Sequence, residues 1–145
     1  YLDIYESVLG QECKLFDNAY QLLDSLDSRG IDYGVVTNKS SRFTVPLLSQ
    51  YDLLGRMKTL VCGDEVSKRK PDPEPLIKAL EKIEYSYNKS NVYYVGDAEK
   101  DISAARAADI RSIACTYGYR DENDDPSSWK SDFLINNIMK VNEIV

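Results

Sequence analysis

Polar side chains follow apolar, strand-like runs at the points where these runs end. "VVTN" ends on Thr37 and Asn38, "VYYVGD" ends on Asp97, and Asp101 follows four residues later. Lys70 lies in the loop "SKRKPDP". Hydroxyl, amide and helix-start N–H groups suit an anionic oxygen, lysine supplies a cation, and carboxylates are ligands that Mg²⁺ prefers. Sites in open parallel α/β sheets lie outside the carboxyl ends of the strands, so we expect these groups to share one edge.

Each of these residues also has an ordinary structural interpretation. Thr37 and Asn38 could turn the chain and cap a helix, and Asp101 could be another cap. Asp97 could be a turn residue after a glycine, and Lys70 part of a solvated basic loop. The combination favours a common site, because capping alone does not predict that all these groups follow successive strands in this order.

Composition narrows the class of protein. With 145 residues, one domain is expected. The chain is 43% hydrophobic and 29% charged, and its apolar runs stay far below the roughly 18 to 20 residues of a membrane span, which predicts a soluble globular protein without a membrane partner. The first ten residues carry no basic group, so no secretory leader is expected. A net charge of -6 argues against nucleic acid as a partner.

The chain has no histidine, which excludes Ser-His, Cys-His and His-ligated zinc chemistry. Its three cysteines, Cys13, Cys62 and Cys115, are odd in number and show no CxxC spacing. We therefore expect buried, reduced thiols in a cytoplasmic protein.

Hydrophobic periodicity predicts helices alternating with strands, and hence a mostly parallel sheet covered by helices on both faces. The segment 2–9 has the spacing of the end of a helix, and the acidic segment 121–128 is expected to be a solvated loop. The expected helices are 17–28, 41–50, 74–83, 101–109 and a short one at the C-terminus; the expected strands are 31–38, 58–64, 92–97, 111–118 and 132–136.

Three motifs at these positions resemble the haloacid dehalogenase (HAD) superfamily. They are "VVTNKS", "KPDPE", and "VGDAEKD" followed by "ISAARAADI", and they look like motifs two, three and four. The resemblance is closest to the phosphoglycolate phosphatase-like subgroup and covers roughly residues 15–145. It implies an α/β fold of the three-layer, Rossmann-like type. Asp109 stands where relatives usually carry glycine, and aspartate tolerates the left-handed conformation expected there.

The resemblance also implies a role for each candidate residue. Thr37 and Asn38 would hold the transferring phosphoryl group, and Lys70 would neutralise the charge of phosphate and nucleophile, which makes Thr37 and Lys70 the catalytic candidates. Asp97, assisted by Asp101, would hold Mg²⁺. Phosphoryl transfer depends on positioning and on electrostatic stabilisation, which these groups can supply without a histidine.

The nucleophile motif of the superfamily is missing from the sequence. Members carry a nucleophilic aspartate in a DxDGT pattern on a first, central strand, and neither "LDIYE" (2–6) nor "LFDNAY" (15–20) matches it. We interpret 1–14 as the remnant of a cap helix or linker and 15–145 as a partial core that lacks the first strand and most of the cap. Two strand edges would then be unpaired, and a missing N-terminal segment or another chain would complete the sheet.

The resemblance predicts a Mg²⁺-dependent phosphatase of small phosphorylated metabolites, with phosphoglycolate as the default substrate. The activity would belong to the parent polypeptide, and this chain alone is expected to be inactive. Two alternatives stay open: a non-catalytic anion-binding or scaffold module, and a sugar phosphomutase of the same superfamily.

Overall fold

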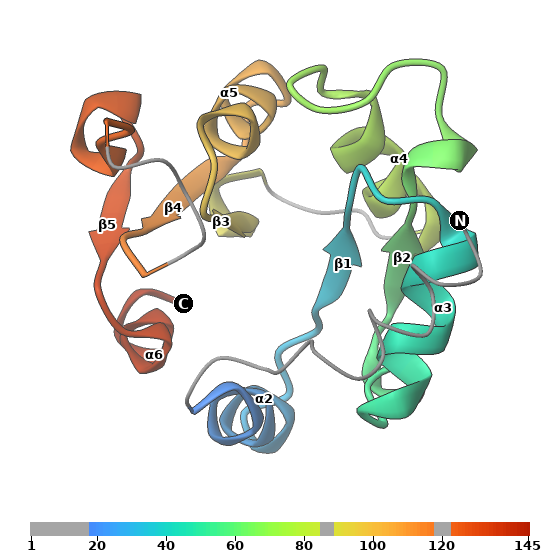
Figure 1. Cartoon of the computed structure of the whole chain (residues 1–145). Coiled ribbons are helices and arrows are strands. Elements are labelled where there is room, and N and C mark those ends of the chain that lie inside the picture. Colours follow the sequence, from blue (N-terminus) through green and yellow to red (C-terminus); the bar gives the residue numbers. More distant parts are fainter. Residues whose placement is uncertain (1–17, 85–88, 118–122) are drawn as a thin grey trace.

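The computed structural model describes residues 18–84, 89–117 and 123–145, and within them it confirms the predicted alternation of helices and strands (Figure 1). The strands are shorter than the apolar runs that predict them. The expected helix end at 2–9 and the proposed boundary at 14/15 lie outside the described residues. The helices are α2 (Ala19–Ser28), α3 (Ser41–Gln50), α4 (Glu74–Lys82), α5 (Glu99–Ala107) and α6 (Val141–Ile144); the strands are β1 (Gly34–Val36), β2 (Thr59–Val61), β3 (Tyr93–Gly96), β4 (Arg111–Cys115) and β5 (Phe133–Ile135).

The described strands form two parallel sheets, where the sequence suggested one. The first sheet is β1-β2 and the second is β3-β4-β5, and every pair is parallel. In Figure 1, β1 and β3 face each other, and no strand of the described ranges lies between them. The N–H of Thr37 donates to the carbonyl of Val61 in β2. Since backbone groups alternate in direction along a strand, the Val36 carbonyl points away from β2, toward the side of β3.

Helices α4 and α5 cover one face of both sheets. Their apolar cluster contains side chains from β1 and from β3, and it therefore joins the two sheets in one core. Its buried members are Leu76, Ala104, Ala105, Ala108 and Ile110, and the half-buried Val36, Leu80, Val92 and Tyr94 pack against them.

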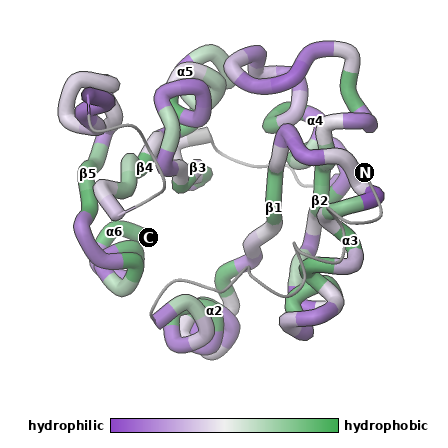
Figure 2. The backbone as a smooth tube through the Cα atoms, in the orientation of Figure 1, coloured by the Kyte–Doolittle hydropathy of each residue, from purple (hydrophilic) through white to green (hydrophobic). Residues whose placement is uncertain are grey.

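Helices α2 and α6 cover the opposite face of the larger sheet, and together with α4 and α5 they form the three layers of the predicted fold. Figure 2 shows mostly apolar strands at β1, β2 and β5, and a helix α2 with both apolar and polar positions. The buried members of this second cluster are Leu22, Leu26, Ile113, Cys115, Ile135 and Val141.

Local sequence signals explain several helix ends. Pro73 precedes the first turn of α4, where its fixed φ angle is favourable and its missing N–H is not needed. Gly30 ends the turn after α2 with a φ of 69°, a conformation that costs glycine little. Asp109 has a φ of 60°, as expected for its position after α5.

The prediction of a solvated loop at 121–128 is wrong for part of this segment. A short 3₁₀-helix spans Pro126–Trp129, and both of its terminal residues are buried. The indole of Trp129 lies in a cluster with Ile102 and Ala114, and its Nε1 donates to Asp124 at 2.9 Å. Burying a large aromatic ring favours the core, while its N–H still has a partner. Because the preceding residues are acidic, the sequence pattern did not predict that Trp129 is buried.

Two of the three cysteines fall in the described residues, and both are buried and free, as predicted. Cys13 lies outside these ranges. None of the helices described is long and apolar enough to cross a bilayer.

Candidate active site

The ammonium group of Lys70 occupies the centre of the predicted site. Its Nζ lies 2.7 Å from Oδ1 of Asp101, 2.8 Å from the hydroxyl of Tyr94 and 3.2 Å from the carbonyl oxygen of Val36. The side chains of Lys70 and Asp101 are each only 7% exposed. Lys70 therefore does not belong to a solvated basic loop, and it links α5, β3 and β1.

The side chain of Asn38 fixes the main chain of Lys70. Its Oδ1 accepts from the Lys70 N–H, and its Nδ2 donates to the Lys70 carbonyl, both at 3.0 Å. The amide thus pairs with the loop before α4 as a neighbouring strand would. The proposed contact of Asn38 with substrate stays a prediction, and its side chain has this positioning role.

Thr37 lies at the end of β1, but its hydroxyl oxygen accepts from the backbone N–H of Lys39 at 3.1 Å. The first N–H of α3 is also used, because Ser41 donates to Asp64 through its backbone at 2.8 Å and through its hydroxyl at 2.6 Å. These donors lower the pKa of Asp64. The role of Thr37 in holding phosphate stays a prediction.

The loop after β2 supports the loop after β1 at close range. A Cβ atom at Gly63 would lie 2.1 Å from the carbonyl oxygen of Asn38, so only glycine fits there. The next residue, Asp64, caps α3 as described above. The run "VCGD" predicts polar groups at the end of this strand, but it does not predict that Asp64 caps α3.

Asp97 and Asp101 flank the start of α5. Asp101 is the third residue of the helix, and its Oδ2 accepts from the N–H of Ala98 at 3.1 Å, which confirms its role in opening the helix. A Cβ atom at Gly96 would lie 2.3 Å from Cβ of Asp101, so the glycine permits this approach. Within the described ranges, the carboxylate of Asp97 makes no hydrogen bond or ion pair.

The two carboxylates differ in their fitness as metal ligands. Both supply the oxygen donors that Mg²⁺ prefers, and Mg²⁺ sites typically use one or two carboxylates together with water and phosphate. Asp97 is available, whereas both oxygens of Asp101 are engaged by Lys70 and Ala98. The described residues contain no group of three or more His, Cys, Asp or Glu side chains suited to a metal. The two carboxylates are of the donor type that a hard cation binds, and the metal-binding role of Asp97 and Asp101 stays a prediction.

Sequence reasoning did not assign a role to two tyrosines at this edge. Burial, together with the negative charges of Asp101 and Asp97, raises the pKa of Tyr94. Burial also raises the pKa of Tyr117, which follows β4. Both hydroxyls therefore stay protonated near neutral pH. Tyr94 sits at an apolar-looking position of "VYYVGD", and only tertiary packing shows what its hydroxyl contacts.

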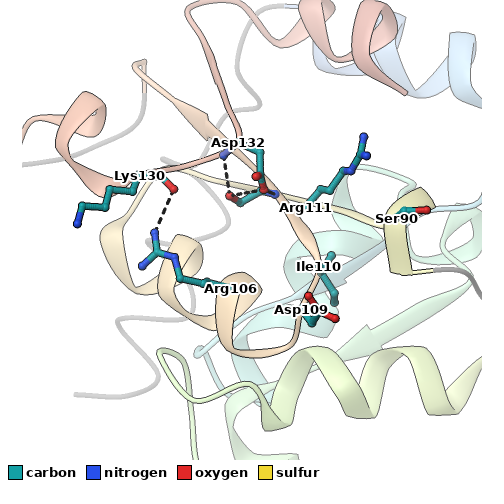
Figure 3. A pocket seen from close by; sticks show the side chains of 8 residues that line it. Ser90, Arg106, Asp109, Ile110, Arg111, Lys130 and Asp132 are labelled. Atoms are coloured by element: carbon teal, nitrogen blue, oxygen red, sulfur yellow. Dashed lines mark hydrogen bonds between the residues drawn. The ribbon is translucent and has the colours of Figure 1, made fainter.

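A separate pocket of about 480 Å³ lies at the other end of the strands, near the start of β4 and β5. Figure 3 shows its charged side chains diverging: the head of Arg111 points away from Arg106 and Lys130. Arg106 donates to the carbonyls of Trp129 and Lys130, which explains its position structurally. The pocket holds none of the predicted site residues.

The fold and the site together define a class of α/β protein in which polar groups gather at the carboxyl ends of parallel strands. Residues 1–115 match the family model of the haloacid dehalogenase-like hydrolases. The chain belongs to this family.

Relatives agree with the predicted subgroup. A phosphoglycolate phosphatase of Xanthomonas campestris pv. campestris is 40% identical over 135 residues, which cover 93% of this chain and 60% of the relative. An N-acetylmuramic acid 6-phosphate phosphatase of Pseudomonas putida is 34% identical over 145 residues, covering 100% of this chain and 64% of the relative. The chain thus spans about three fifths of the length of these curated relatives.

Solved structures confirm the fold. A predicted phosphoglycolate phosphatase from Haemophilus somnus superposes with a TM-score of 0.88 at 26% identity, covering 97% of this chain and 61% of the other. A putative beta-phosphoglucomutase from Thermotoga maritima has a TM-score of 0.85 at 22% identity, covering 99% of this chain and 67% of the other. At this level of identity the second likeness concerns the fold alone.

Proposed function

We propose that the polypeptide to which this chain belongs is a Mg²⁺-dependent phosphatase of small phosphorylated metabolites. The observation that carries the proposal is the buried Lys70–Asp101 ion pair at the strand ends, beside the available carboxylate of Asp97. A buried lysine is costly unless it is paired, and phosphate chemistry gives a reason to keep a cation there. Phosphoglycolate and N-acetylmuramic acid 6-phosphate are the first substrates to test, because relatives carry these names.

In this proposal the residues of the chain act by position and charge. Lys70 offsets the negative charge of the phosphoryl oxygens, and Thr37 with the amides after β1 orients them. Asp97 would hold the metal ion, with Asp101 supporting Lys70 from the other side. Bound Mg²⁺ would supply further neutralisation of the transferring group.

The nucleophile must come from outside the motifs present in this sequence. The facing edges of β1 and β3 are suited to a parallel strand, because both offer backbone groups without a strand partner among the described residues. We propose that an N-terminal segment or another chain supplies this strand and carries the nucleophilic carboxylate. Two buried free thiols support the cytoplasmic location that we assign to the protein.

The decisive experiment joins the chain to the part of the Xanthomonas campestris relative that the match leaves uncovered. The fusion of these two parts is called the joined polypeptide. Its release of phosphate from both substrates is compared with that of the chain alone. We expect Mg²⁺-dependent release from the joined polypeptide only. Asp97→Asn should weaken Mg²⁺ binding by calorimetry, with Asp109→Asn, at the far end of α5, as the matched control.

Two results would contradict the proposal. A folded joined polypeptide that binds inorganic phosphate but releases none from either substrate would favour the anion-binding module. Transfer of phosphate between positions of a sugar phosphate, without net release, would favour the phosphomutase.

A further inference from the structure

The ammonium group of Lys70 has no spare donor in this structure. A lysine ammonium carries three N–H groups, and Lys70 meets three acceptors, on Asp101, Tyr94 and Val36. To act on a phosphoryl oxygen, it must release one of them. The contact with Asp101 is the shortest and joins opposite charges, so it is the strongest. The contact with the Val36 carbonyl, at 3.2 Å, is the longest.

The hydroxyl of Tyr94 stands in the middle of this arrangement. It lies 2.9 Å from the Val36 carbonyl and 2.8 Å from Nζ of Lys70. A hydroxyl has one proton to donate, whereas an ammonium group can only donate and a carbonyl oxygen can only accept. The directions are therefore settled: Lys70 donates to Tyr94, and Tyr94 donates to Val36.

We propose that Tyr94 is the positioning residue of Lys70: it holds one N–H of the ammonium group and keeps the Val36 carbonyl paired, so that Lys70 can turn another N–H toward an anionic oxygen. This inference rests on the proposed function. Without the hydroxyl, the same movement would leave a half-buried carbonyl with no donor, which opposes the movement. A strand arriving between β1 and β3 would place its own N–H near the same carbonyl and would favour the release of Lys70 further.

The neighbouring Tyr93 provides a matched control. It lies on the same strand, and its ring faces the other side of the sheet, in the cluster of α2 and α6. Its hydroxyl accepts from Arg111 at 3.4 Å and has no contact with Lys70. Tyr93→Phe and Tyr94→Phe thus remove the same atom from adjacent residues, and both keep the ring in its apolar cluster.

The first measurement uses the chain itself and needs no activity. In a ¹H–¹⁵N spectrum of lysine side chains, the three hydrogen bonds should make the Lys70 ammonium visible as a slowly exchanging signal, assigned through its own side-chain carbons. We expect Tyr94→Phe to broaden or abolish this signal and Tyr93→Phe to keep it. An unchanged signal in Tyr94→Phe would overturn the proposal.

If the Tyr94→Phe variant does not fold, the proposal is tested on the unsubstituted chain instead. The hydroxyl proton of Tyr94 should then exchange slowly and show a nuclear Overhauser effect to the ε protons of Lys70. A rapidly exchanging hydroxyl without this contact would refute the positioning role.

The second measurement uses the joined polypeptide. We expect Tyr94→Phe to lower kcat/KM by about tenfold or more, since the Lys70 ammonium group then loses the acceptor that holds one of its N–H groups in place, and Tyr93→Phe to change it less than about twofold. Equal effects of the two variants would contradict the role of Tyr94. If the joined polypeptide is inactive in every form, the proposed function fails, while the ammonium signal still decides on Tyr94.

Discussion

The buried ion pair of Lys70 and Asp101 allows a quantitative test of how this site is held together. Asp101→Asn removes one charge and keeps the shape of the side chain. At 2.7 Å the two charges attract by about 6 kcal/mol if the effective dielectric constant is about 20, and the cost of removing both ions from water offsets much of this. Removing one partner leaves the other buried and unpaired. We therefore expect the free energy of unfolding to fall by about 3 to 5 kcal/mol.

The assay is urea unfolding followed by the fluorescence of Trp129, the only tryptophan of the chain, which is buried. An exposed pair provides the control. Arg56 contacts Asp24 at 2.8 Å, but the carboxylate side chain is 71% exposed, so Asp24→Asn should cost at most about 1 kcal/mol.

A double-mutant cycle separates the interaction energy of the Lys70–Asp101 pair from the effect of each residue alone. Lys70→Met costs stability because Asp101 loses its partner, yet combining it with Asp101→Asn removes both charges and leaves none unpaired. We expect the double variant to lose less stability than the two single variants added together. The reasoning would be refuted if Asp101→Asn cost no more than Asp24→Asn, or if the single effects simply added.

Three further predictions concern the surroundings of the site. Gly96→Ala should lower the free energy of unfolding by about 1 to 3 kcal/mol in urea titrations, because its Cβ would overlap with Asp101; an unchanged midpoint would speak against this packing. The hydrogen bonds from Ser41 lower the pKa of Asp64. The stability that Asp64→Ala removes should therefore be fully present above the ordinary carboxyl pKa of 3.8 and disappear as the pH falls through the lowered value. A stability difference between the two proteins that does not change with pH would contradict this. Leu76→Ala should lower the free energy of unfolding by about 2 to 5 kcal/mol, because Leu76 is buried in the cluster shared by both sheets. A loss below about 1 kcal/mol would speak against a cluster that joins the two sheets.

The helices and strands of this chain could be predicted from the sequence because their signals are local. Apolar spacing predicts α2 and α4, and the residues around their ends, such as Gly30 and Pro73, act within one turn. The motifs behind the candidate site are local as well: "VGDAEKD" places Asp97 and Asp101 at the start of a helix wherever that helix packs. The family membership follows from the same short motifs and is confirmed by the match over residues 1–115.

The contacts that determine the chemistry of the site depend on residues far apart in the chain. Asn38 and Lys70 are 32 positions apart and Val36 and Tyr94 are 58 apart, and no periodicity within one segment can predict that they meet. Burial likewise belongs to the whole fold: it turns Lys70 from an apparent loop residue into an ion-paired group. The chemical groups that are available, and the elements that carry them, can be inferred from the sequence alone. Which donors are already occupied follows only from the three-dimensional arrangement, because hydrogen bonding and desolvation depend on every segment that surrounds a group.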